Sequence, residues 1–380
     1  MRAAHPLSPH AFSTLRRLTT LTAVMTLTLT MVSCSIGESN GDPVISSLTA
    51  QKADATVPRN SKSDMDNEPL SSAVGTVSMI TSDENGKKGA VSGDMTTTVV
   101  SRERSTNNFQ WAVSIKPAVA NQERTEYADN AQSVMSENMD LSSTGSAVVS
   151  PDGRYLSLIL LPAEQQSGET AADLRTHIVV LDTTTGKTVR NATVSGVILG
   201  QVLTNSTLAV ETAQNYFPAG SGKGTITTFS LTDTSAQPSS FPPDKWLVGA
   251  TRENLALTPE PLSDDCFYGC SMMTVTLINA DGSTAGSISG VTAVHPGGWI
   301  HRVADPKSDE QQLVNPSIKK TIDITGKNTF ERGVPTGPGL LVEQKSPDGK
   351  GSTAPKPVFW LSSSDDGHPH TENLEQFENH

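Results

Sequence analysis

Hydrophobic residues occur along most of the chain in short runs rich in Val, Ile, Leu and Thr, and each run is bounded by Gly, Pro, Asp or Asn. Such runs are typical of β-strands joined by tight turns. Long stretches with apolar residues at helical spacing are absent from the sequence, and the best helical candidate, residues 121–140, is polar and weakly periodic. We therefore expect an all-β fold.

A repeat emerges when the runs are aligned by the turns that follow them. The turn positions 186, 233, 282, 326 and 367 are 47, 49, 44 and 41 residues apart. Spacings of about 40–50 residues indicate the blades of a β-propeller. The strands predicted before these turns are residues 176–182, 225–231, 273–278, 318–324 and 357–361.

A second set of strands falls between these turns. Ser150-Pro151-Asp152-Gly153, followed by an apolar strand at 155–160, resembles the turn between inner strands of WD40-like, TolB-like and YVTN propellers. The resemblance implies a six- or seven-bladed propeller over residues 73–367, and two β-sandwiches are the alternative. Ring closure is expected to pair a strand near 75–80 with the last blade, because an unpaired edge is a hazard. Further strands are expected at 76–80, 109–115, 197–199, 208–210, 246–248, 255–257, 293–294, 299–300 and 339–342.

The first 33 residues have the pattern of a signal peptide. Arg2, Arg16 and Arg17 precede an apolar, Thr-rich stretch at 18–32. That stretch is shorter than the about 20 residues that a membrane-spanning helix needs, so it predicts a secretory signal. The Arg16-Arg17 pair leaves twin-arginine export open beside the general secretory route.

The signal ends in Met31-Val32-Ser33-Cys34, which resembles the bacterial lipobox. The resemblance implies cleavage before Cys34, a lipid on its sulfur, and anchoring at the extracytoplasmic face of the cell membrane. An ordinary cleaved signal with a chance Cys is the alternative. We expect residues 34–72, rich in Ser, Gly, Asn and Asp, to form a flexible linker, and residues 368–380 to form a polar C-terminal tail.

The chain has three cysteines. With Cys34 assigned to lipid, Cys266 and Cys270 remain, and an oxidising exterior favours a disulfide between them. Two free thiols or half of a metal site are the alternatives. No second pair of Cys or His follows at ligand spacing, so no metal or other cofactor is predicted.

The charge is acidic. The chain holds 28 Lys and Arg against 40 Asp and Glu, a net charge of −12, and removal of the three arginines of the signal peptide leaves 25 against 40. This balance argues against nucleic acid, which needs a basic surface. The predicted partners are the lipid bilayer, through Cys34, and an envelope protein or cell-wall ligand.

Local motifs offer little chemistry. The sequence 220–225 lacks the Gly and Ser/Thr positions of a phosphate loop, and the Ser-x-x-Lys at 317–320 lies in a predicted strand without its companion motifs. His295, Trp299 and His301 flank a Gly pair and are the candidate binding residues, although a blade turn with a core Trp explains the same cluster. No catalytic residues are predicted.

Three function classes remain from the sequence. A non-catalytic binding or assembly lipoprotein accounts for an anchor, a linker and a propeller. A propeller enzyme of the lactonase, lyase or quinoprotein type would place its residues in the central channel, where several blades contribute and no local motif reveals them. A solute-binding lipoprotein would need an α/β fold.

Overall fold

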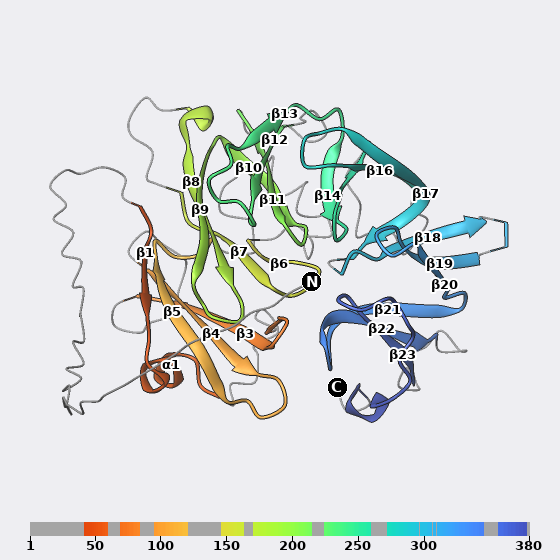
Figure 1. The fold of residues 1–380 in the computed structure, drawn as a ribbon, viewed down its shortest axis with the longest axis horizontal. Helices are drawn as coiled ribbons and strands as arrows, with labels where there is room; N and C mark the ends of the chain where they lie inside the picture. The colour runs from red at the N-terminus through yellow and green to blue at the C-terminus, as the bar shows by residue number, and fades with distance from the viewer. Residues whose placement is uncertain are drawn as a thin grey trace, which may run out of the picture. The chain divides into compact units, whose positions relative to one another are not determined.

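The computed structural model describes residues 42–59, 69–83, 95–120, 146–162, 170–214, 224–259, 272–295, 297–305, 307–308, 310–345 and 356–377. These residues form antiparallel strands in five sheets, with one α-helix, α1 (Ala50–Thr56), among the described elements (Figure 1). Within this part of the chain no helix has the length and apolar character to cross a bilayer. The all-β expectation is confirmed.

The sheets follow one another along the chain, as blades do. The first sheet runs β1 (Val44–Ser47), β5 (Phe109–Lys116), β4 (Thr96–Glu103), β3 (Gly75–Ser82) and β2 (Leu70–Ser71). The second contains β6 (Ala147–Val149), β7 (Tyr155–Ile159), β8 (Arg175–Asp182) and β9 (Thr188–Ser195). The third contains β10 (Val197–Leu203), β11 (Thr207–Ala213), β12 (Thr225–Ser230) and β13 (Ser239–Phe241).

The fourth sheet is longer because one strand serves two repeats. Its strands are β14 (Trp246–Ala250), β15 (Leu255–Thr258), β16 (Met273–Ile278), β17 (Thr284–Val294), β18 (Ile300–Asp305), β19 (Glu310–Asn315) and β20 (Lys320–Asp323). The first half of β17 pairs with β16 and its last residues pair with β18. Gly290, with φ of +74°, lies between the two halves and supplies a backbone conformation that L-residues avoid. The last sheet contains β21 (Lys327–Val334), β22 (Gly337–Gln344) and β23 (Lys356–Ser362).

Each sheet packs against the next through an apolar core, and this packing of successive meanders makes the fold a β-propeller. Strand alternation explains the cores: Val99 packs toward the second sheet, while its neighbour Val100 packs on α1. The first strands of successive sheets lie beside one another, with contacts between β6 and β10 and between β10 and β14. These strands therefore form the inner wall of the propeller.

Most of the strands predicted from the repeat are confirmed within a residue or two. The strand predicted at 318–324 is shorter, because Lys319 adopts φ of +54° in a turn and β20 begins only at Lys320. The predicted ring closure is wrong: β3 (Gly75–Ser82) pairs with β2 and β4 of its own sheet. The helical candidate at 121–140 lies outside the described residues.

Two predicted domain boundaries are also wrong. Part of the segment assigned to the linker is folded, because β1 pairs with β5 and the side chains of Ala53 and Val57 on or beside α1 are buried. Part of the expected tail is folded too. Trp360 and His370 exchange two backbone hydrogen bonds of 2.9 Å, and Phe377 is buried against the last sheet. In both segments, a few apolar side chains among polar neighbours make the contacts with the sheet.

Candidate functional site

The most organised polar region of the structure is a set of turns that follow the inner strands. The turn at 204–207 is held by Thr204, whose Oγ1 accepts hydrogen bonds from the backbone N–H groups of Ser206 and Thr207. Thr251 does the same for Glu253 and Asn254 in the turn at 251–254. Both threonines are buried. A hydroxyl that satisfies the N–H groups of its own turn fixes the turn's shape.

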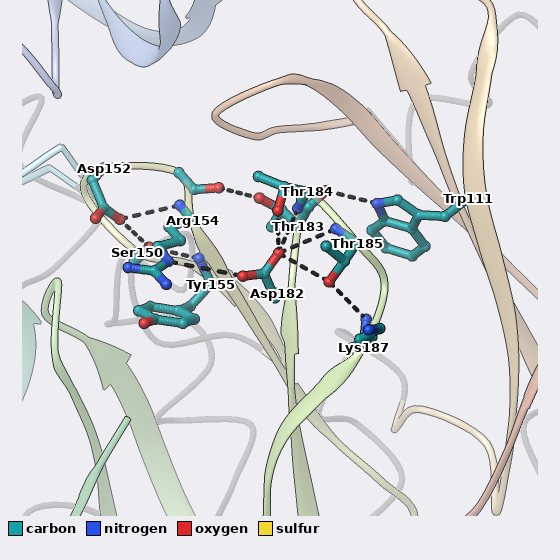
Figure 2. A network of polar contacts seen from close by, with 11 residues as sticks. Trp111, Ser150, Asp152, Arg154, Tyr155, Asp182, Thr183, Thr184, Thr185 and Lys187 are labelled. Carbon is teal, nitrogen blue, oxygen red and sulfur yellow. Dashed lines mark hydrogen bonds and ion pairs between the residues drawn. The ribbon is translucent and has the colours of Figure 1, made fainter. Parts of the chain in front are cut away.

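The turn at 150–155 is a variant of the same design. Ser150 Oγ accepts from the N–H of Tyr155 at 2.9 Å and donates to Asp152 Oδ1 at 2.6 Å (Figure 2). In the turn at 72–75, Ser72 Oγ accepts from the N–H of Gly75 at 3.1 Å. We call the turns at 72–75, 150–155, 204–207, 251–254, 295–299 and 334–337 the hub.

Neighbouring hub turns are hydrogen-bonded to each other. The N–H of Ala73 donates to the carbonyl oxygen of Gly153 at 3.0 Å. The N–H of Asp152 donates to Asn205 Oδ1 at 3.1 Å, and the N–H of Asn205 donates to the carbonyl oxygen of Arg252 at 2.9 Å. Four of the hub turns, at 72–75, 150–155, 204–207 and 251–254, are therefore joined in a polar belt that crosses from sheet to sheet.

The hub turns also meet closely at Gly153. A Cβ at this position would clash with the backbone nitrogen of Ala73 and lie 2.8 Å from Pro338 Cδ of the last sheet. The first, second and last sheets thus converge on one glycine. With φ of +74°, position 153 also has a conformation that favours glycine.

Arg252 is a half-buried cation of the hub. Its Nη2 donates to the carbonyl oxygen of Asp365, which follows the last sheet. Burial lowers the pKa of Arg252, and the carboxylates of Asp365, Asp152, Asp366 and Glu253 oppose that shift. Four carboxylates therefore act on one guanidinium, and acidic groups outnumber the arginine in this part of the hub.

Outer turns add further carboxylates to the side of the propeller that carries the hub. Asp182 begins the turn 182–187 and accepts from the N–H groups of Thr184 and Thr185, as Figure 2 shows. Burial raises the pKa of Asp182, but these hydrogen bonds outweigh it and the net shift is downward. The turn is bound to the hub, since Thr183 Oγ1 donates to the carbonyl oxygen of Gly153 at 2.7 Å.

Asp233 and Asp281 occupy matching outer turns. The side chain of Ser235 donates to Asp233, that of Ser283 donates to Asp281, and hydrogen bonds from the same serines lower the pKa of both carboxyl groups. Each outer turn is tied to a hub turn, through Leu231 to Ser206 and through Asn279 to Asn254. At neutral pH, ionised carboxylates therefore lie on three outer turns that are bonded to the hub.

The structure brings His295, Trp299 and His301 together at one hub turn. His295 Nδ1 lies 2.9 Å from Glu331 Oε1, and the rings of His295 and His301 stack with centroids 6.4 Å apart. Burial, and then the neighbouring His295, lowers the pKa of His301 to about 4. Trp299 is fully buried in the apolar core between the fourth and last sheets, so its indole packs there rather than lining an open surface.

Cys34, Cys266 and Cys270 all lie outside the described residues, so their lipidation and pairing stay predictions. Among the residues that the structure does describe, no group of three or more His, Cys, Asp and Glu side chains is arranged to hold a metal ion.

Sequence reasoning missed Asn205 and Arg252, the residues that join the hub turns. A signal for them exists. Thr204-Asn205-Ser206-Thr207 and Thr251-Arg252-Glu253-Asn254 share a Thr at the first position, 47 residues apart, and each is followed by a Leu among the first two residues of a strand. The period of the repeat is thus carried by the hub turns as well as by the outer turns.

Comparison with known proteins gives likeness in fold alone. No protein-family model matches the chain, and no curated protein matches its sequence. Among solved structures, the β-propeller domain of the trilobed protease from Pyrococcus furiosus is 10% identical with a TM-score of 0.36, over 72% of this chain and 76% of that one. TolB from Acinetobacter baumannii is 10% identical with a TM-score of 0.31, over 74% of this chain and 61% of that one.

An acylaminoacyl peptidase from Pyrococcus horikoshii is 9% identical with a TM-score of 0.34, over 82% of this chain. The aligned region spans 53% of the peptidase, about half its length. Similarity at this level transfers neither activity nor partner.

Proposed function

We propose that the chain is an extracytoplasmic lipoprotein, anchored in the cell membrane through Cys34, whose propeller is a non-catalytic binding module. The hub side is the proposed binding surface. The observation that carries this proposal is the arrangement of carboxylates on turns that are already fixed by hydrogen bonds. A preformed surface binds without the entropic cost of ordering its loops.

The charge of the hub side indicates the partner's chemistry. The carboxylates of Asp152, Glu253, Asp365 and Asp366 act electrostatically on Arg252, and the outer aspartates extend the acidic area. Complementary potentials speed association and select partners. We therefore propose that the partner is an envelope protein that presents a basic segment.

The binding proposal is tested by cross-linking in intact membranes. The wild-type chain and a Glu253→Gln/Asp366→Asn variant are captured, and the cross-linked proteins are identified. We expect one reproducible partner that the variant loses, and that the wild type loses at high salt. Glu310→Gln is the matched control. Glu310 is the first residue of β19, beside the end of β18 that is opposite to the hub turn.

Two results would contradict the binding proposal. Capture that is equal for the wild type and the hub variant would remove the hub as the binding surface. Turnover of a small substrate by the purified protein, without a partner, would favour the propeller enzyme. The anchor is tested separately: Cys34→Ala should move the protein from the membrane fraction to the soluble fraction.

A further inference from the structure

Four joints between consecutive sheets are filled by apolar side chains from both sides. One core cluster combines residues of the first and second sheets, another combines the second and third, another the third and fourth, and another the fourth and last. At the second joint, for example, Ile178 and Val180 pack with Leu208 and Val210. Separating such a joint exposes apolar surface to water, at a cost of roughly 25 cal/mol per Å².

The joint between the first and last sheets, which we call the seam, is built differently. None of the apolar clusters in the described part of the chain combines residues of these two sheets. The hydrogen bonds that cross the seam among those residues come from Arg104. Its Nη1 donates to the carbonyl oxygens of Val334 and Gly337, the latter at 3.1 Å.

Arg104 is held in place by its own sheet. Its Nη2 donates to Ser71 Oγ at 2.9 Å and to the carbonyl oxygens of Ser72 and Gly75 at 3.0 Å. All five acceptors are neutral, so the guanidinium has no carboxylate partner among them. Burial lowers the pKa of Arg104 accordingly. Its desolvation is an electrostatic cost that renewed hydration would relieve.

In the first and last sheets, the face that does not pack on a neighbouring sheet is covered by a nearby segment of the chain. On the first sheet, α1 covers the face opposite the second sheet, where Ala53 and Val57 pack with Val100 and Ala112. On the last sheet, the C-terminal segment 374–377 covers the face opposite the fourth sheet. There Phe377 packs on Leu341 and Trp360. Apolar surface therefore stays covered on each side whether or not the sheets touch.

We infer that the propeller opens at the seam, and that the hydrogen bonds of Arg104 hold the first and last sheets together in the closed state. Opening breaks the two bonds from Arg104 Nη1 and parts Pro338 from Gly153, while every apolar cluster among the described residues remains whole. The motion opens a lateral gap between the inner strands of the first and last sheets, next to the hub turns. The seam is a property of the fold and does not depend on the proposed binding function.

The test measures the distance between the two sheets in the intact chain. Spin labels carried on unnatural residues at Val44 of β1 and Lys356 of β23, both exposed positions, avoid the native cysteines. Double electron–electron resonance should reveal a minor population of molecules in which the two spin labels are further apart. Arg104→Ala should enlarge it about tenfold or more, because two hydrogen bonds from a charged donor are lost.

Two further variants complete the test. A Cβ on Gly333 would lie 3.4 Å from Ser71 Cβ, close to the separation of about 3.8 Å in disulfides. Ser71→Cys/Gly333→Cys removes one acceptor of Arg104, so its oxidised form, compared with the same variant reduced, should lock the seam and abolish the long distance. Arg190→Ala is the matched control. Arg190 Nη1 bonds Ser230 and Thr234 across the second joint, which has an apolar cluster, and its loss should leave the distances unchanged.

Opening at the seam is excluded if the two spin labels show a single distance that neither Arg104→Ala nor the oxidised cysteine pair changes. An equal effect of Arg190→Ala would also overturn it, because the seam would then be no weaker than another joint. If Arg104→Ala fails to fold, the comparison of the oxidised and reduced cysteine pair decides alone.

Discussion

The indole nitrogen of Trp111 donates a 2.6 Å hydrogen bond to the carbonyl oxygen of Thr183, and so joins the first sheet to the outer turn of the second (Figure 2). The ring packs over Gly186, where a Cβ would lie 2.7 Å from Trp111 Cδ2. One aromatic side chain thus supplies both the apolar and the polar contact at this joint.

Trp111→Phe should keep most of the packing and lose the hydrogen bond. We expect a loss of about 1–2 kcal/mol in the free energy of unfolding, because the carbonyl of Thr183 is left without its donor. Urea unfolding measures the change. Trp360→Phe is the control, because Trp360 Nε1 donates to the carbonyl oxygen of Glu372, in the segment that follows the last sheet. A Trp111→Phe variant as stable as the wild type would show that the hydrogen bond does not stabilise the joint.

Gly153→Ala should be among the most damaging small substitutions in the hub. It combines backbone strain with a clash against Ala73 and Pro338, and we expect a loss of more than about 3 kcal/mol. Gly326→Ala separates the two effects, because Gly326 has φ of +71° but no atom within 4 Å of its Cβ position. That control should lose about 1 kcal/mol. Equal losses would show that the hub turns do not press on position 153.

His370 should hold the C-terminal segment more firmly in acid than in base. Burial lowers the pKa of His370, but hydrogen bonds to Asp365 and Glu372 outweigh it and raise the pKa above 6.5. The stabilisation is therefore complete below pH 6.5 and is lost as the pH rises through the raised value. Hydrogen exchange of the Trp360 and His370 amides, corrected for intrinsic rates, should show protection falling with pH. His370→Gln should remove this dependence.

His301 should act in the opposite direction. Its pKa is about 4 in the folded state, while in the unfolded chain it returns to about 6.5. Between those values the unfolded state binds the extra proton, so stability falls as the pH drops from 6.5 to 4. Urea midpoints over this range test the sign. His301→Gln should flatten the slope, and a midpoint that rises toward pH 4 in the wild type would contradict it.

The repeat made most of the fold predictable, and the limits of that prediction have physical causes. Strand runs such as 225–231 and turns such as Ser150 to Gly153 are local signals, since side-chain alternation and turn chemistry act over a few residues. The buried Ala53 and the packed Phe377 were missed because each lies in a segment without a sustained apolar pattern, and its packing partners lie elsewhere in the chain.

The candidate site was harder to predict than the fold. His295, Trp299 and His301 were found as a cluster, but their burial depends on the last sheet, which local sequence does not reveal. Arg104 and Arg252 look like ordinary surface arginines in the sequence. Their acceptors at Val334 and Asp365 are more than 100 residues away.

The absence of a shared strand at the seam, within the described residues, bears on how such a chain can change over evolutionary time. In a ring closed by a shared strand, one sheet is completed by a strand from the other end of the chain, so the two ends must fold together. Here each terminal sheet completes its own pairing and carries its own cover. A duplication or deletion of a whole repeat would leave the strand pairing of both terminal sheets intact, so only the contacts of Arg104 and Pro338 across the seam would have to form anew.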